Sequence, residues 1–299
     1  MSGYNQDITM GKSAEMDPAK QTIQALDTAA KVASSPLVSI LIDRATGYKL
    51  SKWSAEGEVK KREILSAYEA AKQAGVSGIQ EGLGLRQTAN LINVAAKSAK
   101  YTNDTSKSIA IDNDFFWNAV DYAQHVSDEE VQEVLAKILA GEYNEPGKYS
   151  LSTLQVLRGL GRKELISFQK VAALLLDASM IPENVYADPH EFLEGASFSD
   201  FQMLQSLGLI LPNIMTKSIT NPAGTIYIGY QDMALLFQIE GEKPDSIRIP
   251  GWYGLSQAGA QIVEGLSVDF NQDYYEWVTN NYVLPGYKIV KPVVAQTDK

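Results

Sequence analysis

Side chains that could do chemistry are few in this 299-residue chain, which has no cysteine and two histidines. His125 follows Asp121 by four positions, about one helical turn, and Asp188, His190 and Glu191 lie together in the segment DPHEF. A working zinc site needs three or four converging ligands. Neither group extends into a recognised metal-binding spacing. We expect capping or surface roles, and keep the second group as the candidate metal ligands of a hydrolase.

Motifs of nucleotide-binding proteins and serine hydrolases are missing from the sequence. Four glycines occur in GVSGIQEGLGLRQ, residues 75–87, but no strand precedes them and no Gly-Lys-Ser/Thr ending follows, as a phosphate-binding loop requires. The serines lack a Gly-x-Ser-x-Gly elbow. We therefore predict no catalytic residue and no cofactor, identify no small-molecule ligand, and favour a non-catalytic protein.

Charge is distributed unevenly along a chain of formal net charge -10. Residues 44–100 contain ten basic and five acidic side chains, whereas residues 112–145 contain nine acidic side chains and Lys137. The overall charge argues against non-specific nucleic-acid binding. The asymmetry indicates either pairing of the two regions, internally or head to tail between subunits, or the solvated face of a long helix.

The most apolar run, VASSPLVSILI at residues 32–42, is too short to span a membrane, which takes about 20 apolar residues. It favours a short helix that begins at Ser35 and Pro36. As an alternative, segment 35–53 is an amphipathic anchor of a membrane-active effector. The cations and the tryptophan assigned to such a membrane or anionic-partner contact are Lys31, Arg44, Lys49, Lys52, Trp53, Lys60, Lys61 and Arg62.

The most regular pattern lies in residues 126–160, where two short amphipathic helices follow each other. Ser127 and Glu130 have the spacing of a capping box, and Ser150 is the expected cap of the second helix. Apolar residues recur between them at the spacing of one buried helical face. Each residue of this stretch thus has a structural explanation, and we interpret the stretch as a scaffold.

The stretch FFWNAVDYAQHVSDEEVQEVLAKILAGEYNEPGKYSLSTLQVLRGLGRKELISFQKVAALLL, residues 115–176, resembles a bacterial and prophage family catalogued as domain of unknown function family 2806. A looser likeness extends to YGLSQAGAQIVEGL near the C-terminus. The resemblance implies a helical body followed by a small mixed module, and it carries no catalytic residues across. It also hints at a setting in mobile elements or phage defence.

The last third of the sequence has β-rich runs. TIYIGYQDMALLFQIE predicts a hairpin around Gln231 and Asp232, and SFSDFQMLQSLG predicts a helix before it. A helix, a hairpin wing and the segment LSQAG resemble the winged-helix pattern. Residues 198–208 contain Asp200 and no basic residue, whereas a DNA-reading helix is rich in Arg and Lys. This favours a protein-binding module over one that reads a specific nucleic acid.

These patterns predict a mainly α fold with a smaller, winged-helix-like α+β module. The expected parts are a disordered leader (1–16), a helical arm (17–104), a compact helical subdomain (105–181), a linker (182–197), the α+β module (198–294) and a tail (295–299). The absence of cysteine and of a secretory signal favours a cytoplasmic protein. We expect an oligomeric protein-interaction protein, with a protein partner or self-association. A membrane-active effector and a metal-dependent hydrolase are the alternatives.

Overall fold

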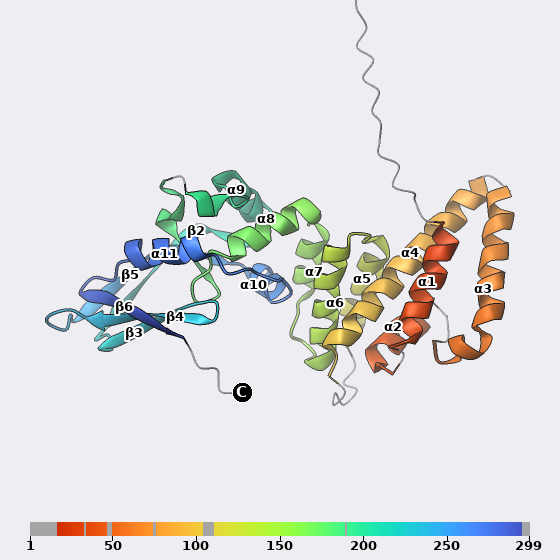
Figure 1. Cartoon of the computed structure of the whole chain (residues 1–299), viewed down its shortest axis with the longest axis horizontal. Helices are drawn as coiled ribbons and strands as arrows, with labels where there is room; N and C mark the ends of the chain where they lie inside the picture. The colour runs from red at the N-terminus through yellow and green to blue at the C-terminus, as the bar shows by residue number, and fades with distance from the viewer. Residues whose placement is uncertain are drawn as a thin grey trace, which may run out of the picture. The chain divides into compact units, whose positions relative to one another are not determined.

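The computed structural model describes residues 17–32, 34–46, 50–73, 76–103, 111–188 and 190–294 (Figure 1). The expected leader and tail lie outside these ranges. The chain divides into two compact units, which we call unit 1 (Met1–Thr105 and Ala123–Ser127) and unit 2 (Ser106–Tyr122 and Asp128–Lys299).

Unit 1 is built from four helices, α1 (Pro18–Ala30), α2 (Pro36–Thr46), α3 (Leu50–Gln73) and α4 (Val76–Ser98). The Asp17 carboxylate caps α1 by accepting a 2.9 Å hydrogen bond from the Ala19 amide, and Pro18 occupies the first helical position. Helix α4 contacts the other three helices. The buried Thr22 hydroxyl donates to the Leu85 carbonyl at 2.8 Å, which fixes α1 against α4.

The helical part of unit 2 contains α6 (Glu129–Asn144), α7 (Leu151–Arg158), α8 (Arg162–Ala172) and most of α5 (Asn113–His125). The buried Tyr122 hydroxyl donates to the Leu157 carbonyl at 2.8 Å and joins α5 to α7. The buried Glu142 carboxylate accepts hydrogen bonds from the amides of Gly147 and Tyr149, at 2.7 and 2.9 Å. This carboxylate shapes the turn between α6 and α7, where Gly147 has a φ of +87°.

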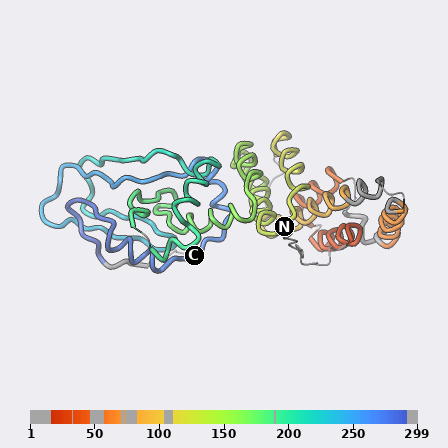
Figure 2. The backbone as a smooth tube through the Cα atoms, turned by 90° about the horizontal axis from the view of Figure 1, so that it is seen from above, coloured from red at the N-terminus to blue at the C-terminus, as the bar shows by residue number. Residues whose placement is uncertain are grey.

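The rest of unit 2 contains two antiparallel three-stranded sheets. One has the strand order β1 (Met180–Pro182), β5 (Ser246–Leu255), β2 (Ile210–Thr220), and the other has the order β3 (Thr225–Tyr230), β4 (Met233–Ile239), β6 (Tyr287–Val294). Figure 2 shows β2 and β5 running side by side as a long ribbon. Helices α9 (Phe198–Ser206), α10 (Gln257–Val263) and α11 (Gln272–Asn281) complete this region. The predicted mainly α fold with a smaller α+β region is confirmed.

Helix α10 is fixed to the turn before α7 by a polar network within unit 2. The Gln261 amide nitrogen donates to the Lys148 carbonyl at 2.5 Å, and the Gln261 amide oxygen accepts from the Ser150 amide at 3.4 Å. The Lys148 ammonium lies 2.9 Å from the Glu264 carboxylate, and Lys137 donates to the Gly265 carbonyl at 2.9 Å. The C-terminal α+β region is therefore bonded directly to the helices that precede it.

The predicted linker, residues 182–197, contains regular structure. Pro182 ends β1, which pairs with β5, and two short 3-10 helices follow, η2 (Glu183–Tyr186) and η3 (Glu191–Leu193). Val185 and Ala196 are fully buried, whereas Asp188 is exposed. The segment thus has buried side chains on both sides of an exposed stretch. The domain boundaries proposed from the sequence stay predictions.

Candidate functional site

An open groove of about 530 Å³ lies between α1 and α3 in unit 1. Its lining residues include Lys20 and Asp27 on α1, Lys31 at the C-cap of α1, and Glu58 and Lys61 on α3. Residues three or four positions apart lie on the same side of a helix. Because the lining residues recur at this spacing, one face of each helix borders the groove.

The two walls of the groove are joined by Lys61. Its ammonium lies 3.1 Å from Asp27 Oδ1 on the opposite helix and 3.2 Å from Glu58 Oε1 one turn earlier on α3. The hydrogen bond with Asp27, and then that with Glu58, raises the pKa of Lys61 above its ordinary value. Lys61 is therefore a cross-helix tie whose own charge is already balanced.

The other cations of the groove are available to a ligand. Lys20 on α1 and Lys31 at its C-cap are exposed and lie eleven positions, or about 16 Å, apart along the helix axis. Neither ammonium forms an ion pair with a described residue. Arg62 is also exposed and donates from Nε to the Glu58 carbonyl at 3.3 Å. Four cationic and two anionic lining side chains give the groove a formal charge of +2. This arrangement can attract carboxylates.

Three of the residues assigned from the sequence to an anionic contact come together here: Lys31, Lys61 and Arg62. Lys60 lies next to them on α3 and pairs instead with Glu63, at 3.4 Å. Sequence reasoning missed Lys20, Asp27 and Glu58. The signal that could have found them is helical spacing: Lys20, Asp27 and Lys31 are seven and four positions apart, and Glu58 precedes Lys61 by three positions.

The other assigned residues do not join this groove in the described structure. Arg44 is exposed in the last turn of α2. Lys49 lies outside the described residues, and the side chains of Lys52 and Trp53, on α3, also lie outside them.

The proposed anchor segment contributes its apolar side chains to the core of unit 1. Leu37, Val38, Leu41 and Ile42 are fully buried, and Ile40 is 39% exposed. A membrane-anchoring role would therefore require α2 to leave this core. Among the described residues, no helix is both long enough and apolar enough to cross a bilayer.

His190 packs against aromatic rings in unit 2, and His125 lies beside Gln87 in unit 1. His190 stacks on Phe192, with ring centroids 4.8 Å apart, and lies 5.7 Å from the Trp277 ring. Within the described ranges, no group of three or more His, Asp or Glu side chains could hold a metal ion. Asp188 and Glu191 are exposed beside His190 without forming such a group. His125 Nε2 lies 3.4 Å from the side-chain amide nitrogen of Gln87.

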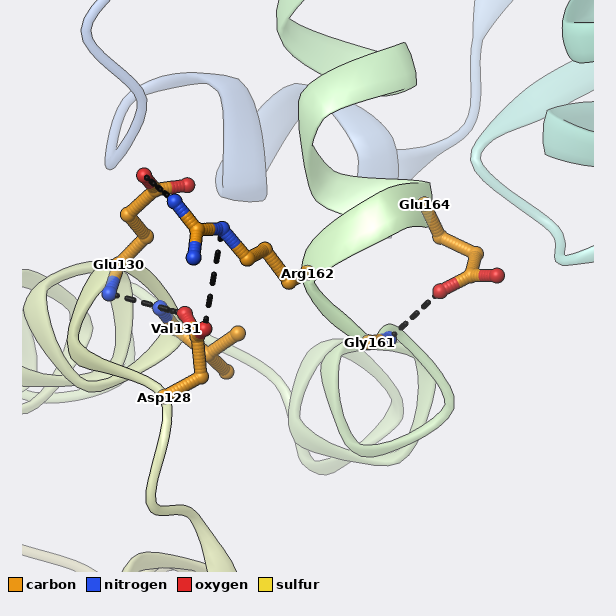
Figure 3. Close-up of polar contacts among 6 residues, drawn as sticks. All are labelled: Asp128, Glu130, Val131, Gly161, Arg162 and Glu164. Carbon is orange, nitrogen blue, oxygen red and sulfur yellow. Dashed lines mark hydrogen bonds and ion pairs between the residues drawn. The ribbon is translucent and has the colours of Figure 1, made fainter. Parts of the chain in front are cut away.

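The cap of α6 corrects the sequence prediction by one residue. Asp128, not Ser127, is the N-cap, and its carboxylate accepts hydrogen bonds from the amides of Glu130 and Val131 at 3.0 and 3.2 Å (Figure 3). The Ser127 hydroxyl instead accepts a 3.2 Å hydrogen bond from the Asn90 side chain. The physical reason is that α6 begins at Glu129, which leaves Ser127 one residue outside the first turn.

Glu130 forms an ion pair in place of the predicted capping-box bond. Arg162, the first residue of α8, donates to Glu130 Oε1 at 3.3 Å and lies 4.0 Å from Asp128 Oδ2. Figure 3 shows the guanidinium between these two carboxylates, and Glu164 accepting a 3.0 Å hydrogen bond from the Gly161 amide. Ser150 is the N-cap of α7. These contacts position helix ends, so this cluster is structural.

One protein family matches the helical part of the chain. Residues 80–184, from α4 through α8 to η2, match the model of a family described as a protein of unknown function, DUF2806. Searches of curated proteins and of solved structures give no match. The likeness seen in the sequence at residues 115–176 lies inside this range. Residues 80–184 are therefore similar to the DUF2806 family.

Proposed function

We propose that this chain is a non-catalytic protein-interaction protein that works as an oligomer. The observation that carries the proposal is the groove between α1 and α3, where Lys20 and Lys31 flank the cross-helix tie of Lys61 and Asp27. The groove is positively charged on a chain of net charge -10. Such local contrast favours association with an acidic protein surface.

The test is the mass of the purified chain in solution at low and high salt. Light scattering coupled to gel filtration should give a multiple of the 32.8 kDa chain mass at low salt and a shift toward one copy at high salt. The reason is that salt screens contacts between exposed charges. A single copy at every salt concentration would contradict the oligomer.

The C-terminal α+β region supports a winged-helix-like partner-binding module as part of this proposal. Helix α9 precedes β2, the β2–β5 ribbon is flanked by β1, and α10 follows β5 with Ser256 as its N-cap. Helix α9 carries Asp200 and no basic residue. We expect no binding of a labelled DNA duplex in fluorescence anisotropy at moderate salt. Salt-sensitive binding that is lost with Lys217→Ala would favour a nucleic-acid partner instead.

A further inference from the structure

We propose that the groove between α1 and α3 binds the exposed acidic face of α5 of a second copy, in a head-to-tail contact. This inference rests on the proposed oligomer and assigns its contact surfaces. The acidic face of α5 is Asp114, Trp117, Asn118 and Asp121, four exposed residues at helical spacing. Trp117 is 45% exposed between the two carboxylates.

The groove and this face are complementary in length and charge. Lys20 and Lys31 mark out about 16 Å of α1, and the two aspartates of the face are seven residues, about 10 Å, apart along α5. The acidic face therefore fits within the length of the groove. Apolar side chains also line the groove, including Leu65, which is 36% exposed and offers a contact for an indole ring.

The charge pattern around α5 favours this occupant. Residues 112–145 contain nine acidic side chains and one lysine, so the α5 face belongs to a strongly acidic part of the sequence in every copy. Asp121 already pairs with Arg158, which leaves Asp114 as the main anionic contact of the face. A long-range attraction of this kind accelerates and orients association.

The carboxylates within the groove argue against a phosphate-rich occupant. Asp27 and Glu58 lie between the cations of the groove, so a continuous row of phosphates would meet more repulsion there than two carboxylates about 10 Å apart. An α-helix that presents two separated carboxylates around an aromatic ring matches the alternation of charged and apolar groups better. A second copy of the chain carries such a helix.

A contact between two different surfaces predicts complementation between two defective variants. Lys20→Gln with Lys31→Gln removes two of the three groove cations that form no ion pair with a described residue, and Asp114→Asn with Trp117→Ala removes the face. Each double variant alone should elute as a single copy, because every contact needs one groove and one face. Mixed together, they should form a one-to-one heterodimer, because one intact groove and one intact face remain.

Matched variants away from both surfaces should assemble like the unchanged chain. Lys163→Gln and Asp232→Asn alter exposed residues on α8 and in the β3–β4 turn. Circular dichroism checks folding, and Asp114→Lys replaces the face variant if loss of Trp117 unfolds it.

The outcomes separate this inference from the proposed function. An oligomer that survives the face variant, or a mixture without heterodimer, would overturn the head-to-tail contact and leave the oligomer standing. A single copy of the unchanged chain at all salt concentrations would refute both the oligomer and the head-to-tail contact.

If the chain is a single copy and expands when Lys20 and Lys31 are replaced, as measured by small-angle scattering, the occupant of the groove lies in the same chain. Binding of the groove to anionic vesicles at the expense of self-association would also overturn the inference.

Discussion

The hydroxyl of Tyr274, on α11, donates a 2.7 Å hydrogen bond to the carbonyl of Leu174, just after the end of α8. Tyr230, on β3, makes the equivalent contact with the Ala173 carbonyl at 3.0 Å. The last carbonyls of a helix have no partner within the helix and need one elsewhere. Two tyrosines from the α+β region therefore donate hydrogen bonds to the backbone carbonyls that follow α8 in unit 2.

The first prediction concerns the loss of one such hydroxyl. Tyr274→Phe leaves the Leu174 carbonyl without its buried donor and should lower the free energy of unfolding by about 1–3 kcal/mol in urea titrations. Burial raises the pKa of Tyr274 well above its ordinary value, so the hydroxyl stays a donor through the neutral range. Tyr275→Phe is the matched control.

The control lacks the hydrogen bond of Tyr274, and its side chain is half-buried rather than fully buried. The Tyr275 hydroxyl is buried and forms no hydrogen bond with any described residue. Its removal should leave stability unchanged or slightly increased, since an unsatisfied polar atom is removed. Equal losses for both variants would show that the bond to Leu174 does not account for the effect of Tyr274→Phe.

Much of the fold was predictable from local patterns, whereas the groove was not. The apolar spacing of Val131, Leu135 and Ile138 predicts α6 directly, because one buried stripe is enough to define such a helix. The groove depends instead on how α1 and α3 face each other. That arrangement is set by contacts distant in sequence, such as Thr22 with Leu85, which no local pattern encodes.

The second prediction is a pH dependence at the start of α9. Asp200 accepts hydrogen bonds from Ser197, and secondarily from Ser167, which lower the pKa of its carboxyl group. A lowered pKa stabilises the fold above the ordinary value of about 3.9, and this contribution is lost as the pH falls through the folded-state pKa. Asp200→Asn should cost about 1 kcal/mol at neutral pH.

This difference between Asp200→Asn and the unchanged chain should shrink in acid. Urea titrations across the acidic range measure it, and Asp269→Asn, at an exposed position, is the control. A loss of stability that stays constant below the folded-state pKa of Asp200 would show that the carboxylate charge plays no part.

The third prediction uses a glycine in α10. A Cβ atom at Gly259 would overlap the carbonyl oxygen of Leu209, which the backbone holds in place. Gly259→Ala should therefore lower the unfolding free energy by about 1–3 kcal/mol. Gly84→Ala, in α4, meets nothing within 4 Å and should raise stability by about 0.5–1 kcal/mol. Thermal unfolding of both variants distinguishes a steric clash from a general effect of alanine.

The last prediction is that limited proteolysis first cuts the segment between residues 181 and 197. Ala187, Asp188, Glu194 and Gly195 are exposed there, and exposed loops are the preferred sites of nicking. The two fragments should stay together in gel filtration, because β1 pairs with β5 and Gln261 bonds to Lys148 across the cut. They should separate in urea. A first cut within 75–87, with 181–197 intact, would mean that the exposed stretch is held too firmly to enter a protease and that the two-part division from sequence is wrong.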